Sequence, residues 1–348
     1  MKKIWVITAF ALISLLIMLL PGCVKKDGNP ISVPNQQPKT TAIEETKNSP
    51  ADIVVQTDER PIAVMIDNEG VATSRHSGLD KAYAVYEMIV EGSDSRLMAL
   101  FKGVNPSTIG PVRSSRHYFI HYAMEHDAIY VHYGWSPLAQ KTIRDLRVNN
   151  INGVTSDGSI FWRNPKKWSD WHNAFTSMEK IKNLAKKKKY RDTTTESVFS
   201  YSPIEVELKD GTASNKVNVI YSGFKKINYE YDEKTKLYKR FVGIKAHTDA
   251  VSGVQYTAKN IIIERVKNYP LGDGPDQNGK NKGRQQMDTV GSGKGYFVTN
   301  GKYVPITWKK DTPTERTIYK YLDGSEVMFN KGQIWIQIIP VNSKVIFE

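Results

Sequence analysis

Two arginines flank two serines in the segment Arg113-Ser114-Ser115-Arg116, which follows a Gly-Pro pair and opens a predicted helix. The first turn of a helix offers unpaired backbone N–H groups and the positive end of the helix dipole. Guanidinium groups and hydroxyls at such a position can bind a phosphate or a carboxylate. The structural alternative is that a serine caps the helix and the arginines pair with Glu87 or Glu91.

Three carboxylates could supply acid–base chemistry. Glu87 and Glu91 lie four residues apart on one face of a predicted helix, and like charges at that spacing repel. We therefore expect a positive partner, Arg96 or Arg113, to face them. A carboxyl group with a raised pKa could instead act as a general acid. Asp67, which follows a predicted strand, carries the same two alternatives.

His132 follows a predicted buried strand and precedes Gly134, a position typical of site residues; a hydrogen-bonded core histidine is the alternative. Catalysis there would need a carboxylate within hydrogen-bonding distance of His132, or two carboxylates about 5–10 Å apart across a cleft. The chain has no His-Glu-x-x-His, Gly-x-Ser-x-Gly or Walker A motif. Gly274 and Gln285 stand where a calcium loop needs its first and last ligands. We predict no metal site and no cofactor.

Aromatic and polar side chains gather in one short stretch: Phe161, Trp162, Arg163, Trp168, Trp171, His172 and Asn173. Aromatic faces beside polar groups suit sugar rings or peptide chains. They also suit the edge of a hydrophobic core, which is the interpretation we favour for this stretch.

A sheet with helices packed on it must position these groups. Strand-like residues 61–67, 95–102 and 128–133 alternate with helix-like residues 79–90, 113–126 and 137–146. This order predicts an α/β-type arrangement. Ligands bind beyond the carboxyl ends of strands in open sheets of this type, which points to Asp67 and Asn68 after the first strand and His132 after the third.

The C-terminal half is predicted to be mainly β. Strands are expected within residues 217–221, 260–266, 295–308 and 326–340, with a hairpin over residues 228–242. The helix-biased basic residues 180–191 and the Thr/Ser-rich residues after them join the halves. The predicted fold class is α+β, with an N-terminal α/β-type sheet-and-helix domain over residues 58–195 and a smaller, mainly β C-terminal domain over residues 205–348.

The N-terminus carries an export signal. Lys2 and Lys3 precede the uncharged residues 4–20, which have about the length of a secretory hydrophobic region. Leu20-Pro21-Gly22-Cys23 then resembles a bacterial lipobox, in which the thiol is diacylated. Cys23 is the only cysteine in the chain, so no disulfide and no cysteine-based zinc site can form.

We therefore expect residues 1–22 to be a lipoprotein signal peptide and the polar residues 23–57 to be a flexible tether that begins with lipidated Cys23. The alternative is an uncleaved anchor helix followed by an incidental cysteine. In both cases the folded part is predicted to lie on the extracytoplasmic face of the cell membrane.

The chain is basic, with a formal net charge of +13 and a pI near 9.4. Such a charge would ordinarily indicate nucleic acid as a partner. Export argues against nucleic acid, because the polyanions outside the cell are anionic lipids and teichoic-type wall polymers. The predicted partners are the membrane, through the lipid anchor, and a cell-envelope protein or an anionic wall polymer.

Five motifs resemble those of one family. They are Glu91-Gly92-Ser93-Asp94-Ser95-Arg96, Ile109-Gly110-Pro111-Val112-Arg113-Ser114-Ser115-Arg116, His132-Tyr133-Gly134-Trp135-Ser136, His172-Asn173-Ala174-Phe175-Thr176-Ser177 and the glycine-rich run from Gly283-Arg284 to Asn300-Gly301-Lys302. They are similar to the YerB-type lipoproteins of Gram-positive bacteria. The resemblance implies an N-terminal α/β-type domain and a smaller β-rich C-terminal domain, and it implies no established activity.

Three functions remain open. The first is a tethered binding module of the cell envelope with an anion-binding cleft. The second is a glycan or phosphodiester hydrolase or transferase that uses Asp67 or Glu91 with His132. The third, an importer's substrate-binding lipoprotein, needs two similar α/β lobes, and the β-rich half argues against it. The predicted ligand-binding residues are Asp67, Asn68, Arg75, Glu87, Glu91, Arg96, Arg113, Ser114, Ser115, Arg116, His132, Arg163, His172 and Asn173.

Overall fold

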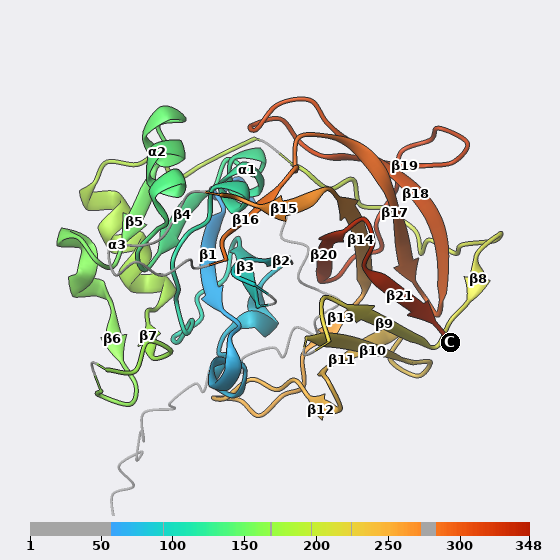
Figure 1. Ribbon diagram of the computed structural model, residues 1–348, viewed down its shortest axis with the longest axis horizontal. Coiled ribbons are helices and arrows are strands. Elements are labelled where there is room, and N and C mark those ends of the chain that lie inside the picture. The colour runs from blue at the N-terminus through green and yellow to red at the C-terminus, as the bar shows by residue number, and fades with distance from the viewer. Residues whose placement is uncertain (1–56, 93, 168, 196, 224, 273–282) are drawn as a thin grey trace, which may run out of the picture. The chain divides into compact units, whose positions relative to one another are not determined.

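One long sheet runs through both halves of the chain (Figure 1). The computed structural model describes residues 57–92, 94–167, 169–195, 197–223, 225–272 and 283–348. Within these residues the long sheet has eleven strands, in the order β19 (Ile318–Tyr321), β18 (Lys302–Lys310), β17 (Gly291–Thr299), β14 (Asn260–Val266), β20 (Ile334–Pro340), β2 (Ala84–Ile89), β3 (Ser95–Phe101), β1 (Ile62–Asp67), β4 (Ile129–His132) and β5 (Asn150–Asn152), with β8 (Thr212–Ala213) paired to β18. The parallel pair β2–β20 joins the two halves.

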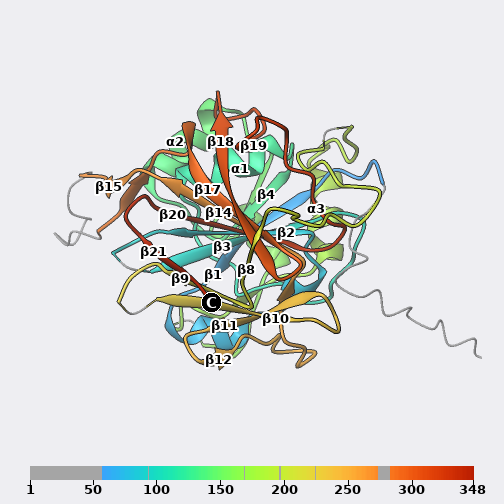
Figure 2. The same ribbon diagram turned by 90° about the vertical axis from the view of Figure 1, so that its right-hand side faces the viewer.

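A second sheet covers one face of the long sheet (Figure 2). Its strands run in the order β12 (Lys245–Ala246), β11 (Leu237–Val242), β10 (Lys226–Asp232), β9 (Lys216–Ile220) and β21 (Lys344–Phe347), and β13 (Thr257–Ala258) pairs with β11. Glu87 on β2 contacts Arg240 of this sheet, whereas the preceding Tyr86 contacts Glu125 on helix α1 (His117–Glu125). Successive side chains of a strand point to opposite faces, so α1 and the second sheet cover opposite faces of β2.

The three described α-helices belong to the N-terminal half: α1, α2 (Pro137–Asp145) and α3 (Met178–Lys187). Serine side chains cap two of them, since Ser136 accepts a hydrogen bond from the backbone of Ala139 and Ser177 accepts one from the backbone of Lys180. Short elements complete the described part: 3-10 turns at Gly70–Arg75, Leu79–Lys81 and Ser156–Ile160, and the strand pairs β6 (Trp162–Arg163) with β7 (Ala174–Phe175) and β15 (Asn268–Pro270) with β16 (Gln285–Met287).

The predicted α+β fold class is confirmed, with an α/β-type N-terminal half and a mainly β C-terminal half. The expected hairpin over residues 228–242 is β10–β11. Asn300 and Gly301 turn the chain from β17 to β18 with φ angles of 49° and 73°, as an Asn-Gly hairpin turn requires. Domains were predicted to meet between residues 195 and 205. Strands from both sides of this boundary pair in the same long sheet.

The helix predicted over residues 79–90 is wrong. Leu79–Lys81 is a 3-10 turn, and Ala84–Ile89 is strand β2, in which all six residues are buried. A strand covered on both faces is apolar throughout, so its spacing of apolar residues does not distinguish it from a buried helix. Its neighbour β20 comes from the far end of the chain, where no local pattern can reveal it.

No helix among the described residues is long and apolar enough to cross a membrane. Several predictions fall outside the described residues: the signal peptide over residues 1–22, lipidated Cys23, all but the last residue of the tether, Trp168, and residues 273–282 of the glycine-rich segment.

Candidate functional site

Asp67, the last residue of β1, is fully buried and contacts two side chains at once. Its Oδ2 atom lies 2.8 Å from Nδ1 of His172 and 3.1 Å from Nε of Arg113. Its Oδ1 atom accepts a 3.1 Å hydrogen bond from the backbone N–H of Glu69. Burial acts to raise the pKa of Asp67, but the hydrogen bond with His172 and the charges of Arg113 and Arg96 outweigh it, so the pKa lies below its ordinary value.

The segment that carries Arg113 lies along the end of β1. The backbone N–H of Asp67 donates to the carbonyl of Pro111 at 2.8 Å, and that of Arg113 donates to the carbonyl of Met65 at 3.0 Å. Main-chain hydrogen bonds therefore place Arg113 beside Asp67 independently of their side-chain contact.

Helix α1 begins at His117, so the predicted helix start at Arg113 is wrong. Arg116 is the N-cap residue, and no side chain caps the helix. Ser115 is buried and accepts a 2.8 Å hydrogen bond from the hydroxyl of Tyr130, while Ser114 donates to the carbonyl of Tyr133 at 3.1 Å. Arg113 and Arg116 therefore lie on a segment that precedes the helix. Ser114 and Ser115 fix this segment by hydrogen bonds to Tyr133 and Tyr130 and do not cap the helix.

Arginines and carboxylates alternate across the site. NH2 of Arg96 lies 3.0 Å from Oε1 of Glu69 and 3.3 Å from Oε2 of Glu91. NH2 of Arg113 lies 3.6 Å from Oε2 of Glu69, and Arg116 pairs with Glu91. The positive partner expected for Glu91 is therefore Arg96, and Arg116 joins it. Shared carboxylates hold the guanidinium groups in fixed orientations.

These ion pairs form part of the wall of a cleft of about 890 Å³. Its charged lining residues are Arg96, Arg113, Arg116, Arg163, Arg284, Glu69, Glu91 and Asp94. Five arginines against three carboxylates leave the lining with two net positive charges. Tyr133, Trp135 and Trp171 add aromatic faces, and Trp171 is 67% exposed. The cleft therefore combines positive charge with aromatic surface.

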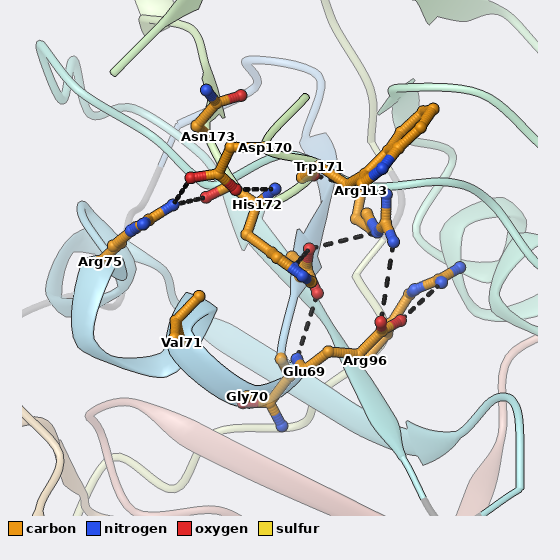
Figure 3. A network of polar contacts seen from close by, with 12 residues as sticks. Glu69, Gly70, Val71, Arg75, Arg96, Arg113, Asp170, Trp171, His172 and Asn173 are labelled. Atoms are coloured by element: carbon orange, nitrogen blue, oxygen red, sulfur yellow. Dashed lines mark hydrogen bonds and ion pairs between the residues drawn. The ribbon is translucent and has the colours of Figure 1, made fainter. Parts of the chain in front are cut away.

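His172 is fixed by its backbone as well as by its ring (Figure 3). Oδ1 of Asp170 accepts a 2.9 Å hydrogen bond from the backbone N–H of His172. Arg75 donates to Asp170 at 2.6 Å and to the carbonyl oxygen of His172 at 3.0 Å. The hydrogen bond with Asp67 raises the pKa of His172, and its side chain remains 25% exposed.

Comparison with known proteins matches two family domains to the chain. "Protein of unknown function (DUF3048) N-terminal domain" covers residues 49–191, and the corresponding C-terminal domain covers residues 217–336. The "Putative lipoprotein YerB" of Bacillus subtilis (strain 168) is 31% identical over 349 residues, which span 98% of this chain and 96% of the relative. The chain belongs to the YerB-type lipoprotein family. The predicted resemblance is thereby confirmed.

A solved member of the family has the same fold. The crystal structure of YerB protein from Bacillus subtilis matches with a TM-score of 0.72 at 31% identity and covers 83% of this chain and 94% of that chain. A match over 83% of this chain extends into both halves of the fold described above.

Asn68 and Glu87 were predicted at the site, but neither lines the cleft. Nδ2 of Asn68 donates to Glu87 at 2.9 Å and to Ser95 at 2.8 Å. The other oxygen of Glu87 accepts from Arg240 at 2.7 Å, and Lys225 donates to the carbonyl of Asn68 at 2.6 Å. These residues fix the chain that follows β1 from the side of the second sheet.

Of the two alternatives given for His132, the structure shows the hydrogen-bonded core histidine, with no carboxylate contact to its ring among the described residues. Nδ1 of His132 lies 2.8 Å from the carbonyl of Gly134, and Nε2 lies 3.2 Å from Oδ1 of Asn150. The ring is buried, and burial lowers its pKa to about 4. His132 is therefore a neutral core histidine, and the histidine that Asp67 contacts is His172.

Arg163 and Asn173 shape the loop that presents Trp171. Asn173 is buried and accepts a 2.7 Å hydrogen bond from Arg163. The guanidinium of Arg163 lies 5.1 Å from the ring centre of Tyr133, which is shared between the cleft and a smaller pocket of about 260 Å³ lined also by Trp162. The predicted aromatic stretch thus borders the cleft.

Asp67, Glu69 and His172 also offer three possible metal ligands, with their ligand atoms within 4.8 Å of one another. No metal site was predicted there. Nε of Arg113 lies 3.1 Å from Asp67 and its NH2 lies 3.6 Å from Glu69, so one guanidinium group already contacts both carboxylates. A cation bound at Oδ2 of Asp67 would have to displace Arg113, and we assign no metal to this cluster.

Three charged residues of the cleft are absent from the predicted ligand-binding residues: Glu69, Asp94 and Arg284. Glu69 carried a usable signal, because it lies two residues beyond Asp67 at the same strand end. Arg284 carried none, since it reaches the cleft from the C-terminal half by backbone pairing with Glu91. The cleft therefore draws on both halves of the chain.

Proposed function

We propose that this protein is a lipoprotein anchored through Cys23 to the extracytoplasmic face of the cell membrane, where its cleft binds an anionic ligand of the cell envelope. The lipobox-like segment and the relative's printed name support the anchor. The observation that carries the binding proposal is the set of five arginines lining one cleft of about 890 Å³, a volume typical of ligand sites.

The lining favours a ligand that carries both phosphate groups and sugar or polyol units. Guanidinium groups bind phosphate oxygens in pairs. The exposed ring of Trp171 and the rings of Tyr133 and Trp135 offer flat apolar faces for a ring or a carbon chain. A teichoic-type wall polymer combines these features, and it lies on the face of the membrane to which the lipobox-like segment directs the chain.

An importer's binding protein is a weaker proposal for this chain. Such proteins close two similar α/β lobes around a hinge. Here an α/β-type half and a mainly β half share one sheet through β2–β20, which opposes hinge motion between them.

Arg113→Ala is expected to weaken binding of poly(glycerol phosphate) at least about tenfold, because it removes a charged donor group from the cleft. The measurement is calorimetric titration of the full chain in detergent. Arg144→Ala, which removes an exposed arginine of α2, is the matched control and should keep Kd within about twofold of wild type. Absence of saturable binding by the wild-type chain would contradict the proposed function.

Cys23→Ala is expected to abolish incorporation of labelled palmitate, because the variant lacks the thiol that is diacylated. The apolar residues 4–20 stay on a chain that is not cleaved before residue 23 and still hold it at the membrane, so palmitate labelling is the measurement. Ser14→Ala, in the same apolar segment, is the control and should be labelled normally. Wild-type labelling of the Cys23→Ala chain would refute the anchor assignment.

A further inference from the structure

A single buried carboxylate holds an acid–base group beside an anion-binding group. Oδ2 of Asp67 lies 2.8 Å from Nδ1 of His172 and 3.1 Å from Nε of Arg113. Asp67 is fully buried, whereas the side chain of His172 is 25% exposed and that of Arg113 is 20% exposed. Arg113 lines the cleft, and so does Trp171, the residue before His172. The histidine therefore lies at the edge of the surface that would hold the ligand.

The histidine is also oriented for proton transfer. Three contacts fix it: Asp170 to its backbone N–H, Arg75 to its carbonyl oxygen and Asp67 to its ring. In the neutral imidazole Nδ1 carries the proton donated to Asp67, and Nε2 then carries the lone pair. Nε2 forms no hydrogen bond with any other residue in the described part of the chain.

We infer that Asp67 and His172 form a general-base pair that activates water to hydrolyse a phosphodiester bound in the cleft beside Arg113. This inference rests on the proposed function, because it assigns a reaction to a ligand of the same cleft. It replaces the predicted use of His132, whose ring contacts no carboxylate among the described residues.

The reaction needs no co-reactant other than water. Nε2 of His172 removes a proton from the water molecule as its oxygen forms a bond to phosphorus. The bond from phosphorus to the leaving oxygen breaks on the opposite side, and that oxygen takes a proton from bulk water. His172 then releases its proton to solvent, so that one phosphodiester and one water give one phosphomonoester and one alcohol. Arg113 stabilises the charge on the phosphoryl oxygens, and Asp67 stabilises the imidazolium.

The test uses the full chain in detergent with synthetic poly(glycerol phosphate) as both ligand and substrate. Binding is measured by calorimetry, and cleavage by the appearance of phosphomonoester ends in phosphorus NMR spectra. His172→Gln can still hydrogen bond to Asp67 and is expected to bind the polymer within about twofold of wild type while its turnover falls at least about 100-fold. The control His121→Gln, which removes a histidine paired with Thr289 outside the site, should keep both properties.

The outcomes are distinguishable. Polymer that binds to the wild-type chain but is not cleaved overturns the hydrolytic inference and leaves the proposed function standing. Polymer that does not bind overturns both. Cleavage that persists in His172→Gln overturns the role of His172. Cleavage that is lost with a chelator and restored by a divalent cation overturns the metal-free base pair and assigns a metal to Asp67, Glu69 and His172 instead.

Discussion

Arg240→Met is expected to lower the free energy of unfolding by about 3–5 kcal/mol, because it leaves Glu87 as a buried charge without its cation. Both side chains are fully buried, with NH2 of Arg240 lying 2.7 Å from Oε2 of Glu87. The guanidinium also lies 4.4 Å from the ring centre of Trp335 and contacts His247. Urea denaturation followed by circular dichroism measures the loss.

Two further variants separate charge from packing. Glu87→Gln in the Arg240→Met background removes the unpaired buried charge and keeps an acceptor for Asn68 and Ser95. It should therefore raise the free energy of unfolding by at least about 1 kcal/mol relative to Arg240→Met. Arg144→Met, at an arginine that is 73% exposed, should change stability by less than about 0.5 kcal/mol. If the double variant is no more stable than Arg240→Met, the loss comes from packing and not from an unpaired charge.

The buried pair also connects the second sheet to the cleft. Glu87 holds Asn68 from within the core, and Asn68 follows Asp67 directly. Arg240 contacts His247, whose Nε2 lies 2.7 Å from Nδ1 of His76, and the ring of His76 lies 2.5 Å from the carbonyl of Asp67. Contacts from the C-terminal half therefore help to fix the backbone at Asp67. For this reason Arg240→Met should weaken ligand binding as well as lower stability.

The sequence predicted the surroundings of Asp67 well, because local patterns determine them. The apolar run of β1 ends in a carboxylate, and a strand end of this kind is where side chains converge in an α/β-type sheet. Arg96 or Arg113 was expected to face Glu87 and Glu91; in the structure Arg96 pairs with Glu91, whereas Arg113 pairs with Asp67 and Glu69.

The choice between histidines could not be made from the sequence. His132 ends a predicted strand, yet its ring turns into the core against Asn150. His172 lies two residues before β7, and the chain just after β7 is held by the bridge between Thr176 and Ile109. This bridge brings the loop that carries His172 next to Asp67. That pairing joins segments far apart in the chain, so spacing along the sequence carried no trace of it.

Mistaking β2 for a helix had a direct consequence for the two glutamates. On a helix, Glu87 and Glu91 would share one face. On a strand that ends between them, Glu87 points to Arg240 and Glu91 lines the cleft beside Arg96. Their charges are therefore balanced by different arginines, one in the core and one at the cleft.

Glu264→Gln is expected to stabilise the protein at alkaline pH and to have little effect at acidic pH. Burial raises the pKa of Glu264 to about 7 from an ordinary 4.5, although hydrogen bonds from Tyr122 and Tyr319 oppose the shift. The folded state therefore holds a proton that the unfolded state has already lost as pH rises through this window. Stability falls with rising pH between these values, by about 3 kcal/mol at the upper end.

Several buried histidines change the stability of the protein with pH in the opposite direction. Burial lowers the pKa of His121, His126 and His132 to about 4 each, so the unfolded state binds more protons there and stability rises with pH. The measurement must therefore be a difference between wild type and Glu264→Gln, taken by urea denaturation from about pH 5 to about pH 8. Glutamine keeps an acceptor oxygen for one tyrosine hydroxyl, presents its NH2 group to the oxygen of the other, and cannot ionise. A difference that grows with pH supports a buried glutamate that is protonated below neutrality, whereas a constant difference would mean that Lys310, which acts to lower this pKa, keeps Glu264 ionised throughout.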